Sequence, residues 1–533
     1  MNRCSPQSAH PLKDQSNTPL VDTLQRCATR QNAAFHTPGH KRGQQITARQ
    51  HQLFGRNAFR ADLPELPDLD NLFAPEGVIL EAQKLAAEAF GAEQTYFLAN
   101  GSTCGIEAAI LAVCNPGDKI VVPRNAHISA ISGLILSGAV PIYIAPDYNQ
   151  QWHIPLAVSP KSIQSALQQH PDTKAVLVVS PTYHGVCSDL EAIAHLAHQH
   201  NIPLIVDEAH GPHFAFHPDL PKSAMASGAD IAIGSTHKTL SAFTQAAMLH
   251  TQGVGGSSCS ETRINQSRLS KSLQLTQSTS PSYLLLGSLD AARHQMATVG
   301  QTLLEQTIEL ADDAVYRLSQ ISELDVLQPQ DRAKATTNNI SGDRTRITVD
   351  VSKLNITGFE ADEIFHKQHQ VTAELPSLNA LTFIISIGNT SEDIDRLVHG
   401  FKQLCQSRSV PLNHSISNSQ RSNQDKQPFD DLRLTQSTMT QSTINSRTAC
   451  SSISPRQAFF AQHQSRTLHQ AIGKISAETI CPYPPGIPTI LPGEVITESA
   501  LLNLQATLKA GGIITGCSDP TLKTVLVVKS IGG

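Results

Sequence analysis

A lysine and an acid, each placed directly after a short apolar run, could together bind an organic ring. Lys238 comes shortly after the run 231–233, and Asp207 ends the run 202–206. The amine of Lys238 can condense with an aldehyde to form a Schiff base. The carboxylate of Asp207 can hold the protonated nitrogen of a pyridine ring. The pair therefore indicates an enzyme that binds an aldehyde-bearing pyridine covalently.

Hydroxyl side chains near a predicted helix start could hold a phosphate group on the same ring. Ser102 and Thr103 follow a glycine in a turn between a predicted strand and a predicted helix. Backbone N–H groups and partial positive charge gather at a helix start, and this favours anions. Ser235 and His237, next to the lysine, could complete the site. These residues predict binding of a phosphate monoester.

Four further residues follow predicted strands and could contact the ring. The imidazole of His127 could stack on a planar ring, and Ala209 is small enough to let the opposite face of the ring come close. His210 and His184 are further polar candidates. Each histidine alone could be a hydrogen-bonded loop residue. Their joint placement at successive strand ends favours one common site.

The elements around these residues predict an α/β fold. Helical spacing alternates with short apolar runs, which is typical of a mostly parallel sheet covered by helices on both faces. Ligands bind such sheets outside the carboxyl ends of the strands, so Ser102, Asp207 and Lys238 would share one edge. We predict strands at 95–98, 119–122, 140–144, 175–179, 202–206, 231–234 and 246–249, helices at 76–90 and 106–113, and a turn at 100–105.

The rest of the chain divides by composition and pattern. A helix is predicted at 281–320, and strands at 346–351 and 381–387, with Ser391 as the N-cap of a later helix. Near the end we expect a helix at 498–509 and a strand at 524–528. The predicted parts are an N-terminal arm without regular elements (1–75), a large domain (76–300), a small α/β domain (301–405), a Ser/Gln-rich linker or disordered segment (406–456) and a C-terminal α+β domain (457–533).

Composition excludes several classes of function. The 533 residues carry a net charge of −5 without basic clustering, which argues against nucleic acid as a partner. The chain contains no apolar run of the roughly 18 residues that a membrane helix needs. Its polar start lacks the apolar core of a signal peptide, so we expect a cytoplasmic protein. The ten cysteines show no metal-ligand spacing, so we expect no metal site.

Several of these segments resemble the signatures of the Orn/Lys/Arg decarboxylases, a group of fold-type-I pyridoxal-phosphate enzymes. The resemblance covers about 20–400 and 470–500, and it is to the shorter members, which lack an N-terminal receiver-like wing domain. The segment 406–456 has no counterpart there. The matching segments are 36–41 (HTPGHK), 65–70 (ELPDLD), 75–77 (PEG), 100–103 (NGST), 180–183 (SPTY), 207–211 (DEAHG), 235–239 (STHKT) and 481–488 (CPYPPGIP).

The resemblance implies pyridoxal 5′-phosphate as the cofactor and a homodimer, or a higher homo-oligomer, with active sites at the subunit interface. Lys238 would be bonded to the cofactor aldehyde and would, with His237, be a candidate to return a proton to the substrate. Asp207 would pair with the ring nitrogen and His127 would stack on the ring. The residues implied at the phosphate are Ser102, Thr103, Ser235 and His237; Ala209 and His210 stay candidate ring contacts.

The implied reaction is loss of CO₂ from arginine, lysine or ornithine, which gives agmatine, cadaverine or putrescine. A basic substrate side chain needs an acidic partner, for which we favour Glu374 over Asp68 and Asp70. His40, in the Pro-Gly segment of the arm, is a further candidate substrate contact.

Two alternatives stay open at this stage. Another fold-type-I enzyme, an aminotransferase or an aldolase-type lyase, would need a carboxylate-binding arginine such as Arg344 or Arg346. A catalytically silent pyridoxal-phosphate-binding scaffold is the other alternative. A silent scaffold would be marked by a missing lysine or acid, and both residues are present.

Overall fold

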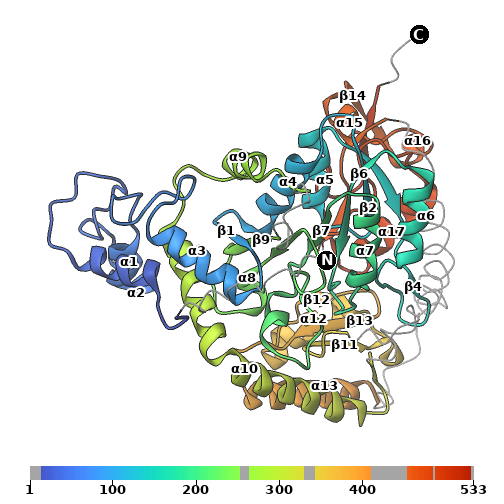
Figure 1. Cartoon of the computed structure of the whole chain (residues 1–533). Helices are drawn as coiled ribbons and strands as arrows, with labels where there is room; N and C mark the ends of the chain where they lie inside the picture. The colour runs from blue at the N-terminus through green and yellow to red at the C-terminus, as the bar shows by residue number, and fades with distance from the viewer. Residues whose placement is uncertain (1–13, 253–262, 329–341, 410–452, 484–485, 530–533) are drawn as a thin grey trace, which may run out of the picture.

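A seven-stranded sheet forms the centre of the molecule (Figure 1). The structure is a computed structural model, which describes residues 14–252, 263–328, 342–409, 453–483 and 486–529. The strand order is β1-β9-β8-β7-β6-β2-β3, and the five strands from β3 to β8 are parallel, while β9 runs antiparallel to β8 and β1. The predicted mostly parallel sheet is confirmed. Its strands are β1 (Gln94–Leu98), β2 (Lys119–Pro123), β3 (Val140–Ile144), β6 (Thr173–Val179), β7 (Leu204–Asp207), β8 (Ile231–Gly234) and β9 (Ala247–Thr251).

Helices cover both faces of this sheet because successive strand residues are buried on opposite sides. Val122 packs in a cluster with residues of α4, α5 and α9, whereas Val121 packs with residues of α6 and α7. The strands therefore read as continuous apolar runs. The helices are α3 (Val78–Ala89), α4 (Gly101–Val113), α5 (Ile128–Ser137), α6 (Pro160–Gln169), α7 (Leu190–Gln199) and α9 (Gln266–Thr276).

The predicted turn at 100–105 is wrong in its extent. Helix α4 begins at Gly101, so Ser102 and Thr103 lie in its first turn rather than before it. Gly101 has φ +75°, a conformation that glycine adopts without strain. This places the two hydroxyl residues directly at the helix start, where the orphan N–H groups are.

A second, four-stranded sheet has the order β10-β11-β13-β12 and is joined to the first by one long helix, α10 (Tyr283–Ser319). The first turns of α10 pack against the arm and α3, and its last turns pack on the small sheet. The predicted domain boundary at 300 thus falls inside a helix that both parts share. The elements are β10 (Asp325–Val326), β11 (Arg346–Asp350), α12 (Gly358–Ile364), β12 (Leu375–Pro376), β13 (Ala380–Ile384) and α13 (Ser391–Ser409).

The predicted N-cap of α13, Ser391, is wrong, because Ser391 is already the first residue of the helix. Thr390 is the N-cap residue instead. Its N–H and its hydroxyl both donate to the carboxylate of Asp393, at 2.8 and 3.1 Å. A Thr and an Asp three positions apart can satisfy each other in the way a capping box does.

The N-terminal arm contains two helices, so the prediction of an arm without regular elements is wrong. Helix α1 (Pro19–Thr29) packs on α10, where Leu20 N–H donates to the buried Asp290 carboxylate at 3.0 Å. Helix α2 (Ala48–Ala61) begins with a capping box between Thr47 and Gln50 and has no buried residue. In Figure 1 this blue segment projects away from the body of the molecule.

The C-terminal part packs on the end of the large sheet. Arg124, directly after β2, donates to both carboxylate oxygens of Glu494 and to the carbonyls of Pro488 and Thr489.

Most of the predicted linker (410–452) lies outside the described residues. The elements are α15 (Pro455–Phe460), β14 (His463–Thr467), α16 (Leu468–Ala471), β15 (Cys481–Tyr483), α17 (Glu498–Lys509), β16 (Ile513–Thr515) and β17 (Thr524–Val528), and a small hairpin elsewhere comprises β4 (Tyr148–Asn149) and β5 (Ile154–Pro155). Among the described helices, none is long and apolar enough to cross a membrane.

Candidate active site

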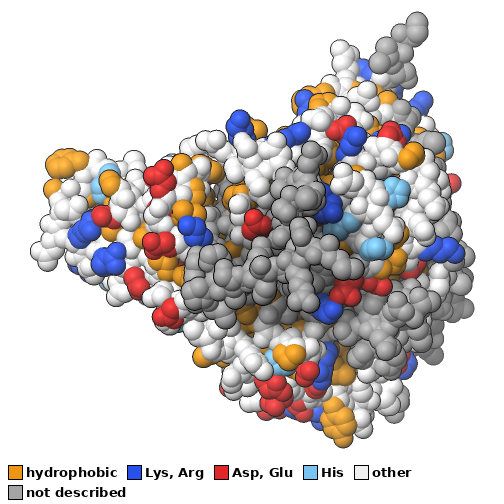
Figure 2. All heavy atoms as spheres, viewed as in Figure 1, with side chains coloured by type: hydrophobic (Ala, Val, Ile, Leu, Met, Phe, Trp, Pro, Cys, Tyr) orange, Lys and Arg blue, Asp and Glu red, His pale blue; other side chains and the backbone are white. Residues whose placement is uncertain are grey.

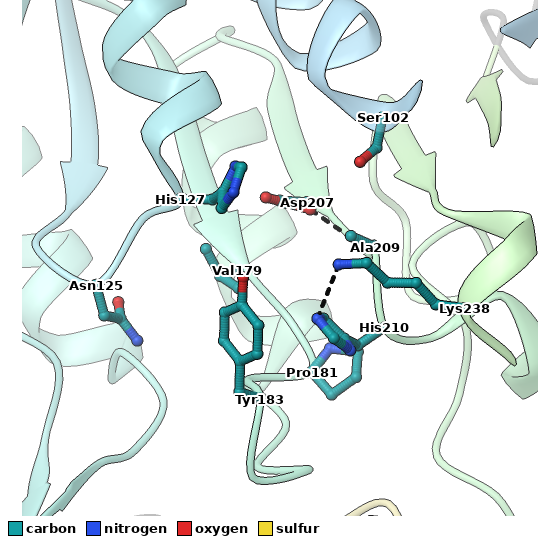
Figure 3. A pocket seen from close by; sticks show the side chains of 10 residues that line it. All are labelled: Ser102, Asn125, His127, Val179, Pro181, Tyr183, Asp207, Ala209, His210 and Lys238. Atoms are coloured by element: carbon teal, nitrogen blue, oxygen red, sulfur yellow. Dashed lines mark hydrogen bonds between the residues drawn. The ribbon is translucent and has the colours of Figure 1, made fainter. Parts of the chain in front are cut away.

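One pocket lies at the carboxyl ends of the parallel strands (Figure 3). It collects residues from the start of α4, the loop after β2 and the ends of β6, β7 and β8, as expected for ligand sites of such sheets. Six of the predicted site residues line it together with four others. The lining residues are Ser102, Asn125, His127, Val179, Pro181, Tyr183, Asp207, Ala209, His210 and Lys238.

Asp207 is the last residue of β7 and is almost completely buried. Its Oδ1 accepts the N–H of Ala209 at 3.1 Å. Burial raises the pKa of Asp207, while the charge of Lys238 and the bond from Ala209 act in the opposite direction. A buried carboxylate is stabilised by a cation held against it, so this side of the pocket suits a protonated ring nitrogen.

Lys238 lies in the short helix α8 (Thr236–Thr239), immediately after β8. Its Nζ is 3.0 Å from Nε2 of His210 and 5.7 Å from the centre of the Tyr183 ring. Burial lowers the pKa of Lys238, against the opposing charges of Asp207 and Glu374. A lowered pKa increases the uncharged fraction of the amine, which is the form that attacks an aldehyde.

His127 caps α5 and presents a neutral ring to the pocket. Its Nδ1 accepts the N–H of Ser129 at 3.2 Å. Burial and the charge of Lys238 lower the pKa of His127 to about 4. Gly486 packs so closely that a Cβ there would lie 3.1 Å from His127 Nε2, and the carbonyl of Gly486 accepts the N–H of Ile128. The C-terminal part therefore holds the segment that carries this imidazole.

The predicted phosphate residues divide into two pairs. The hydroxyl of the fully buried Ser235 donates to the hydroxyl of Ser102 at 2.8 Å, so these two meet at the start of α4. Thr103 is exposed in the same helical turn, and His237 bonds through Nδ1 to the carbonyl of Ala246 at 3.0 Å. Of these four residues, Ser102 lines the pocket, whereas Thr103, Ser235 and His237 do not.

Three of the predicted substrate residues have other partners in the arm. Asp70 accepts the backbone N–H groups of 76, 77, 79 and 80 and thereby caps α3. Asp68 forms an exposed ion pair with Arg30, and His40 bonds to Asp62 at 3.1 Å. Within one chain these residues hold the arm together and do not line the pocket of Lys238.

Glu374 is exposed, directly before β12, and lines a groove of the small domain together with Asp393 and Arg396. Its charge raises the pKa of Lys238 and also acts on Tyr183. Glu374 therefore influences the charge of the pocket residues Lys238 and Tyr183, although it does not line the pocket itself.

Two important residues were not in the predicted site. Tyr183 lies with its ring centre 4.5 Å from that of His210; it belongs to a segment that directly follows a predicted strand, and this position was the available signal. Arg346 is fully buried and donates to the carbonyl of His210 at 3.0 Å and to its Nδ1 at 3.2 Å. Arg344 pairs with Asp312 at the surface. Both arginines that an aminotransferase could have used for a carboxylate are therefore engaged with the protein.

Comparison with known families gives two matches along the chain. Residues 18–398 match the model of the Orn/Lys/Arg decarboxylase major domain. Residues 437–511 match the model of the C-terminal domain of the same family, which begins inside the predicted linker. The first match alone covers more than half of the chain.

Individual relatives agree with these matches. An arginine decarboxylase of Bacillus subtilis is 37% identical over 97% of this chain and 98% of its own length. Lysine decarboxylase LdcA of Pseudomonas aeruginosa is 26% identical over 90% of this chain and 74% of its own length. The solved structure of lysine decarboxylase A from Pseudomonas aeruginosa has a TM-score of 0.79 at 24% identity, and it covers 96% of this chain and 80% of its own. That likeness supports the fold.

Proposed function

Because the chain belongs to the Orn/Lys/Arg decarboxylase family, a group of carboxy-lyases, we propose that it removes CO₂ from a basic amino acid with pyridoxal 5′-phosphate as cofactor. The observation that carries the proposal is one pocket in which Lys238 and Asp207 both line the wall. An amine whose pKa is lowered by burial and a buried carboxylate are the two groups that an aldehyde-bearing pyridine requires.

The donor set of the pocket fits this cofactor. Asp207, whose pKa is raised by burial, offers a carboxylate to a protonated ring nitrogen, and the neutral ring of His127 offers a flat face. Ser102, whose hydroxyl accepts from the buried Ser235, offers its own hydroxyl to the phosphate beside the N–H groups of the first turn of α4. When bound, pyridoxal phosphate supplies an electron sink for the carbon that loses CO₂.

The side chains of this chain supply position and protons. Asp207 keeps positive charge at one end of the pocket, because a buried carboxylate attracts a cation strongly. Lys238 offers the nucleophilic amine and can later deliver a proton to the substrate carbon. His237 was a second predicted proton donor, but it does not line the pocket, whereas Lys238 does, so Lys238 is the better candidate.

We propose arginine as the preferred substrate, with agmatine as the product. The support is the set of relatives named arginine decarboxylase, which are 36–37% identical, against 26% for the lysine decarboxylase LdcA. A panel of arginine, lysine and ornithine, with CO₂ and each amine measured, tests both the decarboxylase activity and the preference for arginine. If more cadaverine than agmatine is released, the preference for arginine is rejected but the decarboxylase activity is not. If none of the three amino acids releases CO₂, the decarboxylase activity itself is rejected.

Glu374 is the proposed partner of the basic substrate side chain. We expect Glu374→Gln to raise KM about fivefold with little change in kcat, which corresponds to ~1 kcal/mol for an exposed ion pair. Glu392→Gln is a matched control, since Glu392 is an exposed acid on the neighbouring helix α13 and pairs with Arg396 at 2.6 Å. Steady-state kinetics on all three substrates give the answer. An unchanged KM and substrate profile in Glu374→Gln would remove this residue from the substrate site.

A second copy of the chain is the proposed partner of the arm. Figure 2 shows hydrophobic side chains on this projecting part of the surface. Phe35, Leu53 and Phe54 are 93%, 75% and 58% exposed, and α2 has no buried residue within one chain. Grouped apolar side chains of this kind mark interaction surfaces. This supports the homodimer that the sequence resemblance implies.

The double variant Leu53→Asp/Phe54→Asp is expected to shift the protein from dimer to monomer, because two charges would be buried at the interface. Sedimentation velocity measures the change. Tyr316→Asp, at an exposed position (67%) on α10, is the control and should leave the dimer intact. A dimer that persists in the double variant would place the contact elsewhere.

A further inference from the structure

A buried row of hydrogen bonds leads from the small domain to Lys238. Nη2 of Arg346, at the start of β11, lies 3.2 Å from Nδ1 of His210 and 3.0 Å from its carbonyl oxygen. Nε2 of His210 lies 3.0 Å from Nζ of Lys238 (Figure 3). Arg346 is 0% exposed and His210 4%. The order of the row is therefore arginine, histidine, lysine, with the lysine at the pocket.

The arginine decides where the imidazole carries its proton. A guanidinium group only donates hydrogen bonds, so Nδ1 of His210 must accept from Arg346. A neutral imidazole has one N–H, which is then on Nε2. An N–H on Nδ1 would instead point at the N–H groups of Arg346. Consequently Nε2–H faces Lys238, and Nζ can accept it only as an uncharged amine.

We propose that Arg346 sets the tautomer of His210, and that His210 donates from Nε2 to Nζ of Lys238, which keeps this amine uncharged and turned into the pocket. Both are positioning residues. The inference deepens the proposed function and rests on its assignment of Lys238 as the amine that takes the cofactor.

Further contacts hold both members of the row in place. Asp343 accepts from Thr345 through its N–H and its hydroxyl, at 2.9 and 2.7 Å, and lies 3.8 Å from Nε of Arg346. The Tyr183 ring packs against the imidazole of His210. These neighbours oppose rotation of the guanidinium and of the imidazole ring.

Burial and the neighbouring cations act in the same direction as this geometry. Burial lowers the pKa of His210 well below its usual value, and Lys238, Arg346, His127 and His213 lower it further. Burial also lowers the pKa of Lys238, with Arg346 adding to this effect, while Asp207 and Glu374 oppose it. A neutral histidine beside an uncharged lysine is thus favoured by the surroundings as well as by the geometry.

The test measures the amine directly in the full-length chain freed of cofactor. Lysines are labelled with a small amine-reactive anhydride over a range of pH, and the peptide with Lys238 is quantified by mass spectrometry against peptides of exposed lysines. In His210→Phe the pKa of Lys238 should rise by about one unit, so that labelling at about pH 7.5 falls about tenfold. His210→Gln, whose amide can accept from Arg346 and donate to Lys238, should stay within about twofold of the unchanged protein.

Arg346 variants separate the tautomer from simple packing. Arg346→Lys keeps a group that only donates and should preserve the labelling profile, whereas Arg346→Met should shift it like His210→Phe. Thermal unfolding shows which variants fold. If Arg346→Met does not fold, the comparison of His210→Phe with His210→Gln still tests whether His210 keeps Lys238 uncharged. A folded His210→Phe with the pH profile of the unchanged chain overturns the inference. The labelling experiment contains neither cofactor nor substrate. A separate failure to release CO₂ would therefore reject the proposed function but would not change the labelling result.

Discussion

Lys238→Ala should lower CO₂ release by on the order of 10⁴-fold, the upper end of what a positioned proton-transfer group contributes. The variant loses the amine that is proposed to attack the cofactor aldehyde and to deliver a proton. We expect the fold to persist, because Lys238 lies in a four-residue helix and alanine keeps its backbone bond to Ser235 O, while the lost side-chain bond is the one to His210. The measurement is initial rate with the preferred substrate, in excess cofactor.

A covalent readout makes this prediction independent of rate. Borohydride reduces a C=N bond to a stable amine, so the reduced cofactor should appear by mass spectrometry on the Lys238 peptide of the unchanged protein. Lys222→Ala is the control, since Lys222 is exposed and pairs with Glu191 at the surface. If the label is found on another lysine, or if Lys238→Ala keeps full turnover, then Lys238 does not hold the cofactor.

The residues that sequence reasoning found are those whose position depends on local pattern. Asp207 and Lys238 follow short apolar runs, and parallel strands bring their carboxyl ends to one edge whatever the loops do. Ser102 and His127 were found for the same reason. Periodicity and strand ends were therefore sufficient to collect most of the pocket.

The residues that sequence reasoning missed depend on contacts between distant segments. Arg346 contacts His210 although the two residues are 136 positions apart in the sequence, because the small domain packs on the large one there. No local sequence pattern predicts that contact. The bond from Nδ1 of His237 to the carbonyl of Ala246 likewise joins two separate segments, and His237 does not line the pocket. For helix α2 of the arm the sequence does carry a signal, the capping-box pair Thr47 and Gln50, which the prediction of an irregular arm did not use.

Asp207→Asn is expected to reduce kcat/KM by on the order of a thousandfold. A carboxylate ~4 Å from a pyridinium charge is worth roughly 4 kcal/mol at an effective dielectric constant near 20, and each 1.36 kcal/mol is tenfold in rate. Asparagine keeps the shape and can still accept the N–H of Ala209. The loss would then report the charge of Asp207 and not its packing.

Stability supplies the second half of this experiment. Burial raises the folded-state pKa of Asp207, so the carboxylate costs stability at any pH above its unfolded value of about 3.8. The cofactor-free Asp207→Asn protein should therefore unfold at the same temperature as the unchanged chain or a higher one. Added pyridoxal phosphate should raise Tm less in the variant, because its ring nitrogen no longer meets a negative charge.

The neighbouring acid is the matched control for this charge. Glu208 is equally buried and its Oε1 accepts the N–H of Ala224 at 2.7 Å, but it does not line the pocket. Burial raises the pKa of Glu208 to about 8, so at neutral pH it is mostly protonated and Glu208→Gln changes little charge. We expect this variant to keep activity within a few-fold. Equal losses in both variants would mean that any buried acid at the end of β7 is needed for folding, and near-normal turnover in Asp207→Asn would remove the proposed contact with the ring nitrogen.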